Sequence, residues 1–370
     1  MSSQKRKRNL GRILVNVVLG MICLLWTVPT FGLMVASFRD QFTIRTSGWW
    51  EIFPHKEYRA VEVLEGDQLP RDFDIDVPFS IPIISDEKHS FEEWRSGIEI
   101  DDQRIQWLGN RRIGKVEFQE PVITADTRFT FDNYRIVLGG QRFEIQQPDG
   151  SIQIVKGDDM WNSFLNSIIV TIPSTVLPIL AAAFAAYGFA WMKFPGRRIL
   201  FVMIIALLVI PLQIALVPIL KDYTRIGING TFLSVWLTHA GFGVGLATYL
   251  LYSYIEQIPR ELLESAFIDG ASHFTIFVKL ILPLSVPALA SYAIFQFLWV
   301  WNDFLIALIF IGETGAEVVT MRLASIVGSR GNDWHLLTSG AFVTMVLPLI
   351  VFFSLQRYFV RGLMAGSVKG

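Results

Sequence analysis

The stretch ESAFIDGASHFTIFVKLILP, residues 264–283, lies between two long apolar segments and determines how the rest of the chain is interpreted. Pro259 suits the first turn of a helix, where its missing N–H group costs nothing. Gly270 can adopt the left-handed conformation that ends a helix. The sequence therefore predicts a short polar helix over residues 259–269, a glycine break and a second amphipathic stretch, which together form a compact helix-turn-helix on one face of a membrane.

The composition indicates an integral membrane protein. The chain has 370 residues, 52% of them hydrophobic, and a mean hydropathy of +0.43, above the usual apolar share of soluble proteins. Crossing the hydrocarbon core of a bilayer takes about 20 helical residues. The first apolar segment is too long for a removable signal peptide and lacks a small-residue cleavage site. Six spans are predicted, at residues 13–36, 163–190, 199–220, 231–255, 284–310 and 338–360.

The distribution of Lys and Arg predicts the orientation, because basic residues are retained in short loops on the cytoplasmic side. With the N-terminus inside, the cytoplasmic segments hold thirteen basic residues. The two short outer loops hold only Lys221, Arg225, Arg322 and Arg330. We therefore expect a multi-pass protein of the cell (inner or plasma) membrane with both termini and the loop at 256–283 in the cytoplasm.

Residues 40–160 carry most of the negative charge, with 24 of the 33 acidic side chains against 14 basic ones. Pro, Gly and Asp clusters punctuate alternating or β-branched stretches in this segment, at residues 59–63, 79–84, 98–105, 115–118 and 143–154. The single cysteine, Cys23, lies in the first span, so the segment contains no disulfide. We predict a β-rich extracytoplasmic insertion, and the alternative is a disordered acidic loop.

Prolines and small residues within the spans predict a bundle whose helices bend and approach closely. Gly241 and Gly245 form a GxxxG spacing, which allows close helix contact or reflects ordinary packing. Prolines interrupt the spans at Pro29, Pro173, Pro178, Pro211, Pro218 and Pro348.

The polar loop resembles the EAA loop of ABC importer permeases. The matching positions are Glu264, Ala266, Asp269, Gly270, Ala271, Leu282 and Pro283. Ser265 and Leu280 depart from the pattern, where alanine and isoleucine are usual. The resemblance implies that the loop docks into a groove on a separate ATP-binding subunit, through Pro259, Glu261, Glu264, Ser265, Ala266, Asp269, Gly270 and Ala271. The alternative is a helix lying on lipid headgroups, but such helices favour Lys and Arg on the polar face, and this one is acidic.

Two further segments resemble carbohydrate-importer permeases. FTFDNY at 129–134 and WNSFLNS at 161–167 are similar to the residues before the second span, which makes 51–128 an insertion. The end of the chain, QRYFVRGL at 356–363 and AGSVKG at 365–370, is similar to the second permease subunit of maltose-type importers. There the tail reaches between the ATPase subunits, and the alternative is a frayed basic terminus. The implied contacts are Gln356, Arg361, Gly366, Lys369 and Gly370.

Signals for catalysis in this chain itself are weak. Gly109, Gly114 and Lys115 satisfy GxxxxGK, but Val116 stands where a P-loop needs a hydroxyl to hold magnesium. The five histidines lack ligand spacing, and neither HExxH nor CxxC occurs. We expect no catalytic residue, metal or cofactor in this chain, with ATP and Mg bound by partner subunits. The basic run at 5–8 is interpreted as a topology anchor rather than a nucleic-acid site.

Polar residues inside the spans are candidates for the translocation pathway or a gate. An ionisable group in a span is costly and faces a cavity or a partner, which singles out Asp303 in the WND sequence of the fifth span. It would lie roughly 28 Å along that helix, near the outer face, as an outer gate or an interfacial structural residue. Asn302, Gln213 and Gln296 are further candidates. Aromatic residues of the spans are interpreted as membrane-interface anchors rather than sugar platforms.

The resemblance implies one transmembrane subunit of an ATP-driven carbohydrate importer, for an oligosaccharide of the maltose or maltodextrin type. Its implied partners are a second permease chain, two ATP-binding subunits and an extracytoplasmic solute-binding protein. The alternatives are an importer of another polyol or glycerol-phosphate-type solute, a secondary carrier and a membrane-anchored receptor. A carrier needs intramembrane charge relays or inverted repeats, and Asp303 is the one plausible relay residue.

The expected fold is all-α and polytopic, with six transmembrane helices of the ABC importer type and the β-rich insertion between the first and second. The expected parts are the N-tail and first span (1–39), the insertion (40–160), five further spans with the coupling loop at 256–283 (161–360) and the C-terminal tail (361–370).

Overall fold

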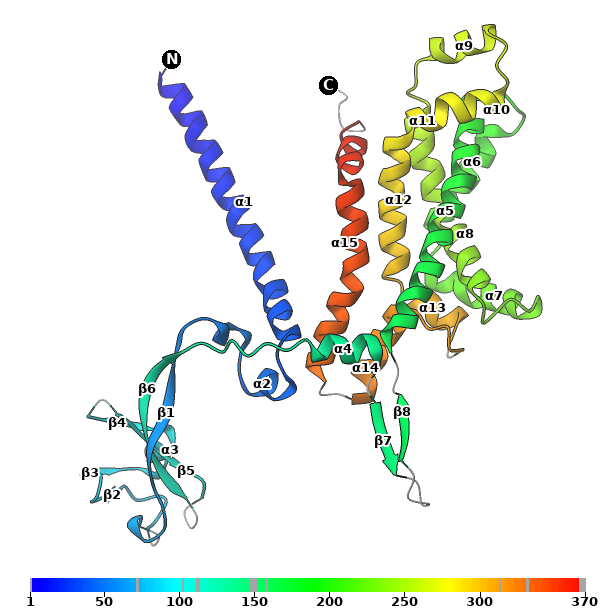
Figure 1. Ribbon diagram of the computed structural model, residues 1–370. Coiled ribbons are helices and arrows are strands. Elements are labelled where there is room, and N and C mark those ends of the chain that lie inside the picture. The colour runs from blue at the N-terminus through cyan, green and yellow to red at the C-terminus, as the bar shows by residue number, and fades with distance from the viewer. Residues whose placement is uncertain are drawn as a thin grey trace. The chain divides into compact units, whose positions relative to one another are not determined.

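The computed structural model describes residues 2–365 except for 71–72, 102, 111–113, 141, 147–151, 157–158, 313 and 331–332. The chain divides into two compact units (Figure 1). Phe42–Phe129 forms the first, called the sheet unit below. Met1–Gln41 and Thr130–Gly370 form the second, called the helical unit. The sheet unit thus ends at Phe129, before the boundary at residue 160 that the charge distribution suggests.

A four-stranded antiparallel sheet in the order β1-β6-β5-β4 forms the centre of the sheet unit. Its strands are β1 (His55–Leu64), β4 (Ile98–Ile100), β5 (Gln103–Leu108) and β6 (Lys115–Thr124), and a separate pair is formed by β2 (Phe79–Ile81) and β3 (Ser85–His89). The short helices of this region are α2 (Gln41–Thr46), η1 (Trp49–Ile52), η2 (Gly66–Gln68) and α3 (Phe91–Ser96). A sheet is therefore present in the segment where strands are expected.

An aromatic core holds the sheet unit together. Trp94 of α3 and Trp107 of β5 are fully buried in one cluster with Ile105 and Val116. Ile105 and Trp107 share a face because successive side chains of a strand point to opposite sides. Trp107 pairs with Val116 across β5 and β6. This alternation is the reason that the polar, acidic segment can fold around a core of its own.

Helix α3 begins with a capping box. The Ser90 hydroxyl accepts a hydrogen bond from the Glu93 N–H, and the Ser90 N–H donates to the Glu93 carboxylate at 2.7 Å. That backbone bond lowers the pKa of the Glu93 carboxyl. The box fixes the start of the helix that carries Trp94 into the core.

Replacing Trp94 with alanine is expected to destabilise the sheet unit by about 3–5 kcal/mol, because a large buried side chain leaves a cavity. The indole also donates to the Phe79 carbonyl at 3.3 Å, and this bond is lost. Limited proteolysis of the full chain in detergent should then cut within Phe42–Phe129 at lower temperature than in the wild type. Ile83→Ala, at an exposed position, is the control. Equal protease resistance of Trp94→Ala and the wild type would contradict this core.

The GxxxxGK sequence begins after β5 and ends at the first residue of β6. Gly109 has φ +91°, and Lys115 begins β6, so a strand follows the glycine–lysine pair. Lys115 Nζ lies 2.7 Å from Glu117 Oε1 on the same strand. A P-loop needs a helix at this point, whose first N–H groups bind the phosphates. The local structure therefore differs from a phosphate-binding loop.

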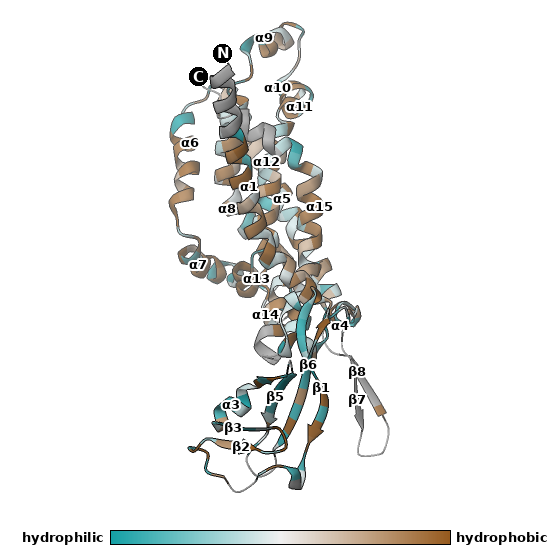
Figure 2. Cartoon of the chain, turned by 90° about the vertical axis from the view of Figure 1, so that its left-hand side faces the viewer, coloured by the Kyte–Doolittle hydropathy of each residue, from teal (hydrophilic) through white to brown (hydrophobic). Residues whose placement is uncertain are grey.

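The helical unit is built on five long helices, α1 (Ser2–Ser37), α5 (Met160–Trp191), α8 (Phe232–Ile255), α12 (Val286–Trp301) and α15 (Trp334–Ala365). Apolar residues run along these helices (Figure 2). Helix α5 packs against α8 and α12, while α15 packs against α12 and α1. The shorter elements are α4 (Asp132–Gly139), β7 (Arg142–Gln146), β8 (Ile152–Lys156), α6 (Arg197–Ala206), η3 (Leu207–Val209), α7 (Leu212–Arg225), α9 (Arg260–Ile268), α10 (His273–Ile276), η4 (Phe277–Ile281), α11 (Leu282–Leu284), α13 (Leu305–Phe310) and α14 (Val319–Arg330).

The described residues support three to five membrane spans, and the expected six are not confirmed. Gly11–Ser37, Met160–Trp191 and Trp334–Tyr358 are long and apolar enough to cross a membrane. Two bent pairs add up to two more spans: Arg197–Val209 with Leu212–Arg225, and His273–Leu284 with Val286–Trp301. The expected span at 231–255 does form a continuous helix, α8, although it is not among these segments.

The helix breaks occur at proline and at polar residues. Pro211 separates η3 from α7, and the pair bends by 104° within the expected span at 199–220. Proline lacks the N–H needed to continue a helix, and its ring clashes with the preceding turn. The expected span at 284–310 likewise ends at Trp301, and α13 begins after three intervening residues. The other five prolines expected to interrupt the spans lie inside continuous helices: Pro29, Pro173, Pro178, Pro218 and Pro348.

Polar groups join the end of α1 to α4. Ser37 Oγ lies 2.7 Å from Tyr134 Oη, and Asn133 Nδ2 donates to the carbonyl oxygens of Ser37 and Arg39. Asn133 and Tyr134 belong to the FTFDNY sequence at 129–134. This sequence therefore fixes the first helix to the rest of the helical unit.

Candidate functional site

The loop between α8 and α12 contains the helix that the sequence predicts. Pro259 precedes α9 with φ −56° and ψ 133°, and the helix runs over Arg260–Ile268. Gly270 follows with φ +79°. The prediction of a helix at 259–269 ended by glycine is thus confirmed to within one residue. The expected coupling residues lie in α9 or in the turns at its ends, with Ser265 exposed.

Two backbone hydrogen bonds end α9 in a Schellman motif. The Gly270 N–H donates to the Phe267 carbonyl and the Ala271 N–H donates to the Ala266 carbonyl, each at 3.0 Å. The left-handed conformation is easy for Gly270, whereas a residue with a β-carbon loses about 1–2 kcal/mol there. Ala266 and Ala271 both pack against the neighbouring apolar cluster. The small residues of the loop therefore allow a tight turn against the long helices.

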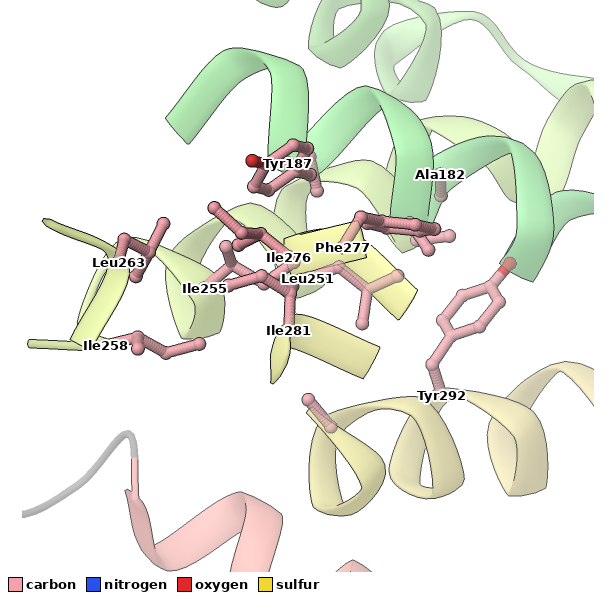
Figure 3. Close-up of a cluster of buried hydrophobic side chains, with 14 residues drawn as sticks. Ala182, Tyr187, Leu251, Ile255, Ile258, Leu263, Ile276, Phe277, Ile281 and Tyr292 are labelled. Atoms are coloured by element: carbon pink, nitrogen blue, oxygen red, sulfur yellow. The ribbon is translucent and has the colours of Figure 1, made fainter. Parts of the chain in front are cut away.

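Leu263 anchors α9 to the rest of the helical unit. Its side chain is 1% exposed and lies in a cluster with Ile255, Ile258 and Ile276 (Figure 3). These residues come from the end of α8, the turn after it, and α10. Burying one leucine contributes roughly 1.5–3 kcal/mol. The sequence alone does not distinguish Leu263 from Leu262, which is exposed.

A second set of contacts joins the loop to α5. His273 Nδ1 of α10 lies 2.9 Å from the Tyr187 hydroxyl. Phe277 of η4 stacks on Phe184, with ring centroids 4.4 Å apart. These contacts are not predictable from the sequence because they join residues far apart in the chain, 86 positions for His273 and Tyr187. The loop is therefore in contact with α5 as well as with α8.

The outer face of α9 combines carboxylates with exposed apolar side chains. Glu261, Glu264 and Asp269 are exposed. Ile268 is 86% exposed, and Phe274 of α10 is also exposed. Large apolar side chains in a patch of this kind are typical of an interaction surface. The surface fits an apolar groove with cationic residues at its rim.

The family of the chain follows from its sequence. Residues 161–364 match the family described as "Binding-protein-dependent transport system inner membrane component". The chain belongs to this family. The matched region includes the α9 loop and the candidate pathway residues, and it lies outside the sheet unit. The chain is therefore an ABC importer permease and a multi-pass membrane protein.

Relatives of this permease are similar along nearly the whole chain. It is 43% identical over 384 residues to the "Alpha-glucoside transport system permease protein AglG" of Rhizobium meliloti, covering 96% of this chain and 97% of the relative. It is 41% identical over 357 residues to the "Osmoprotective compounds uptake permease protein GgtD" of Synechocystis, covering 96% and 91%. Both alignments therefore extend through the sheet unit.

Among solved structures, the permease aligns with a chain of a bacterial ABC transporter involved in the import of the acidic polysaccharide alginate. The identity is 19%, the TM-score is 0.45, and the alignment covers 60% of this chain and 86% of that chain.

Two candidate pathway residues of the permease line one cavity. Gln213 of α7 and Gln296 of α12 both border a cavity of about 360 Å³ beside the bend between η3 and α7. Gln296 is buried, and its Nε2 lies 3.3 Å from the Ser174 carbonyl of α5. The Tyr292 hydroxyl lies 2.9 Å from Gln296 Oε1 and 2.8 Å from the Gly243 carbonyl of α8. Gln296 therefore also helps to join α5, α8 and α12.

Close contacts of α8 occur at Gly243 and Gly245 rather than at Gly241. A β-carbon at Gly243 would lie 2.8 Å from Tyr292 Oη, and one at Gly245 would lie 3.2 Å from the Ile204 carbonyl. A β-carbon at Gly241 would meet nothing within 4 Å. Of the two interpretations of the GxxxG spacing, close helix contact therefore does not hold at Gly241 among the described residues, and the close contacts involve glycines two residues apart.

Gly243→Ala is expected to destabilise the permease by about 1–3 kcal/mol, because the added methyl group overpacks the site against Tyr292 and Gln296. Gly241→Ala is the matched control, two residues earlier on the same helix and in open space. The thermal stability of the purified chain in mild detergent should fall for the first variant only. Equal unfolding temperatures of the two variants would contradict the described packing.

The polar break after α12 caps the next helix. Asp303 Oδ1 accepts a hydrogen bond from the Ile306 N–H at 2.7 Å, and the Asp303 carbonyl accepts one from Thr320 Oγ1 at 2.8 Å. Asn302 is exposed, and neither residue borders the cavity with Gln213. Because α12 ends before Asn302, the estimate that places Asp303 along a single helix is wrong. Its role as a gate stays a prediction beside this capping role.

The C-terminal segment is helical farther than expected. Helix α15 continues to Ala365, so Arg361 and Gly362 belong to a helix rather than a flexible strand. One glycine costs a helix only about 1 kcal/mol, which a long packed helix tolerates. Gln356 is exposed on this helix. Gly366, Lys369 and Gly370 lie outside the described residues, so the contact of the tail with ATP-binding subunits stays a prediction.

Within the described part of the chain, no group of three or more His, Cys, Asp and Glu side chains could hold a metal ion. The expectation that this chain binds no cofactor stays a prediction.

Proposed function

We propose that this permease and a second permease chain together form the translocation pathway of a carbohydrate importer. Two ATP-binding subunits drive it, and an extracytoplasmic solute-binding protein supplies the substrate. The observation that carries the proposal is the arrangement of α9, which presents Glu264 and Ile268 outward while Leu263 is buried in the cluster beneath it. An outward surface of this composition needs a protein partner, and the groove of an ATP-binding subunit would cover it.

In the proposed mechanism, α9 transmits the movement of the ATP-binding subunits to the permease. ATP binds between those subunits and closes them, and closure pulls α9 inward. The packing of Leu263 against Ile255 carries the movement to α8, and the contact of His273 with Tyr187 carries it to α5. The breaks at Pro211 and after Trp301 allow the bundle to change its shape. Closure brings the cytoplasmic ends of the helices together, so the pathway opens to the outside. After hydrolysis the ATP-binding subunits separate, and the pathway opens to the inside.

The names of the relatives support the choice of substrate. One relative is an alpha-glucoside permease by its name, and the other takes up osmoprotective compounds. We assign an alpha-linked glucose oligosaccharide, such as one of the maltose or maltodextrin type, as the substrate. The second candidate is a small osmoprotective solute, in the class of another polyol or glycerol-phosphate-type compound, and the 41% identity to the second relative favours it.

Uptake into proteoliposomes that contain the permease, its partner chain and two ATP-binding subunits tests the proposal. A radiolabelled alpha-linked glucose disaccharide should enter only with ATP and the solute-binding protein present. Competition by unlabelled disaccharide, but not by glycerol phosphate, would support the first substrate class. Uptake driven by a proton or sodium gradient without ATP would instead identify a secondary carrier and contradict the proposal.

The sheet unit is proposed to lie outside the membrane and to help receive the solute-binding protein. Its two ends meet, because the Asp126 N–H donates to the Glu51 carbonyl at 2.7 Å. Residues 51–128 can therefore be deleted and replaced by a short glycine linker. Import should fall while the ATP-binding subunits still co-purify. Unchanged import by a correctly inserted deletion variant would refute this role.

A further inference from the structure

The cavity of about 360 Å³ lies where a membrane helix is interrupted, beside the 104° bend between η3 and α7. Side chains of α7, α8 and α12 line it. Its volume is at the small end of the roughly 300–1,000 Å³ that is usual for small-molecule sites. Its size fits one or two sugar rings rather than a long chain.

The cavity wall combines aromatic faces with polar groups. Trp299 and Phe295 of α12 both border it and are exposed, with ring centroids 5.6 Å apart. Gln213 of α7 is exposed too, and its carboxamide forms no hydrogen bond with the described residues. A sugar ring needs this combination, because it presents C–H groups on its faces and hydroxyl groups at its edge. Aromatic rings bind the faces, and an amide binds hydroxyl groups as donor or acceptor.

The polar groups of this cavity argue against lipid as its occupant. A carboxamide without a partner is expensive in hydrocarbon. A broken helix at membrane depth is tolerated only where it is buried in protein or lines a water-filled space. The bend at Pro211 is such a break, and Gln213 lies two residues after this proline. The mouth of this cavity therefore faces protein or water.

A neighbouring cavity of about 260 Å³ provides a contrast within the same helices. It shares Leu207, Ile210 and Phe242 with the first cavity, but apolar side chains such as Ile219 and Leu237 form most of its wall. The hydroxyl of Thr238, which also lines it, is already bonded to the Ser234 carbonyl at 2.7 Å. This second cavity suits an apolar occupant. The two cavities therefore differ in chemistry although they lie side by side.

We propose that the first cavity is a saccharide-binding site that this chain itself contributes to the translocation pathway. Trp299 supplies the stacking face and Gln213 binds a sugar hydroxyl. Gln296 is a positioning residue, because its bonds to Ser174 and Tyr292 fix the wall of the cavity. The inference rests on the proposed function as a carbohydrate importer. It adds that this permease, and not only its partner chain, contacts the sugar during passage.

Protection of a single cysteine tests the site. Cys23 is the single cysteine of the chain, so Cys23→Ser gives a permease chain without thiols, whose alkylation is measured separately from that of the other subunits. Gln213→Cys is then placed in the cavity, and Thr224→Cys, exposed on the same helix α7 and outside the cavity, is the matched control. Both are alkylated with N-ethylmaleimide in the complete complex, with and without an alpha-linked glucose disaccharide. At ten times the concentration that half-saturates the site, the disaccharide should slow alkylation of Gln213→Cys about tenfold by mass action.

The control cysteine should react at the same rate with and without the sugar. An unprotected Gln213→Cys in a complex that still imports the disaccharide would overturn the site. If no saccharide is imported even by the wild type, the proposed function itself fails, so the two failures are distinguishable. Phe295→Cys is a second reporter in the same cavity for the case in which Gln213→Cys does not assemble.

The stacking residue is tested in the same assay. Trp299→Ala should raise the disaccharide concentration needed for protection about tenfold, whereas Trp299→Phe, which keeps an aromatic face, should raise it less. Leu237→Ala, in the neighbouring apolar cavity, should leave it unchanged. Full protection at the wild-type concentration in Trp299→Ala would overturn the assignment of this indole.

Discussion

Gly270→Pro is expected to abolish ATP-driven import while the permease remains inserted in the membrane. Proline fixes φ near −65°, whereas Gly270 has φ +79°. The substitution also removes the N–H that donates to the Phe267 carbonyl. An incompatible proline costs roughly 3 kcal/mol or more, so the Schellman ending of α9 is lost. The helix then no longer presents its outer face in the orientation that an ATP-binding subunit needs.

Two companion variants separate the backbone effect from the surface effect. Gly270→Ala keeps the N–H and costs about 1–2 kcal/mol for the left-handed conformation, so import should fall only in part. Glu264→Lys leaves the fold of α9 intact, because this side chain is exposed, and should reduce import by reversing the charge of the docking face. Uptake assays and co-purification of the ATP-binding subunits measure both effects. Normal import by both Gly270→Pro and Glu264→Lys would contradict the coupling role of the loop.

The second large effect on import is expected for Leu263→Asp, which should detach α9 from the helices that Leu263 packs against. The substitution places a carboxylate among Ile255, Ile258 and Ile276, where Leu263 is 1% exposed. An isolated charge is very costly there, so α9 should leave the cluster rather than keep the charge buried. The outer face of α9 is unchanged, so the ATP-binding subunits should still co-purify and hydrolyse ATP. Import should be lost, because the movement no longer reaches α8 and α10.

Graded substitutions at the same position control for unfolding. Leu263→Met conserves volume and should cost less than about 1.5 kcal/mol, with import largely kept. Leu263→Ala should cost about 2–5 kcal/mol and give an intermediate loss. Loss of the permease from the membrane in all three variants would point to a folding defect. Import by Leu263→Asp at the wild-type rate would show that the packing of Leu263 does not transmit movement from α9 to the other helices.

Local signals made the polar loop predictable. Pro259 and Gly270 mark the two ends of α9 because proline lacks the backbone N–H and glycine adopts the left-handed conformation most easily, and the structure places both next to the helix. Pro211 likewise marks a break inside an apolar segment. The size of the resulting bend, 104°, depends on packing around α8 and α12 and was not predictable from a proline alone.

Contacts between distant segments were not predictable. Leu262 and Leu263 are neighbours of equal hydrophobicity, and only the approach of α8 and α10 decides which one is buried. The same holds for α8, where Gly241 appeared in a recognisable motif but Gly243 meets Tyr292. Sequence patterns identify which residue types allow close contact, and tertiary packing decides which of them make it.

The candidate pathway residues show the same difference between what the sequence predicts and what tertiary packing decides. Gln213 and Gln296 were singled out as polar groups in apolar segments, and the structure brings both to one cavity. Asp303 was singled out for the same reason, yet its carboxylate accepts the Ile306 N–H at the start of α13. A polar residue in a span thus has several possible structural causes, and its hydrogen-bond partners are needed to tell a helix cap from a cavity wall.

The number of sugar molecules imported per ATP hydrolysed tests the central claim most directly, because that claim assigns the coupling of hydrolysis to transport to the anchored helix α9. The ratio is measured in proteoliposomes with the complete complex, carrying either the wild-type permease or Leu263→Asp. We predict that the variant complex hydrolyses ATP with its ATP-binding subunits bound, while the ratio falls to near zero. A ratio equal to that of the wild type would contradict the account.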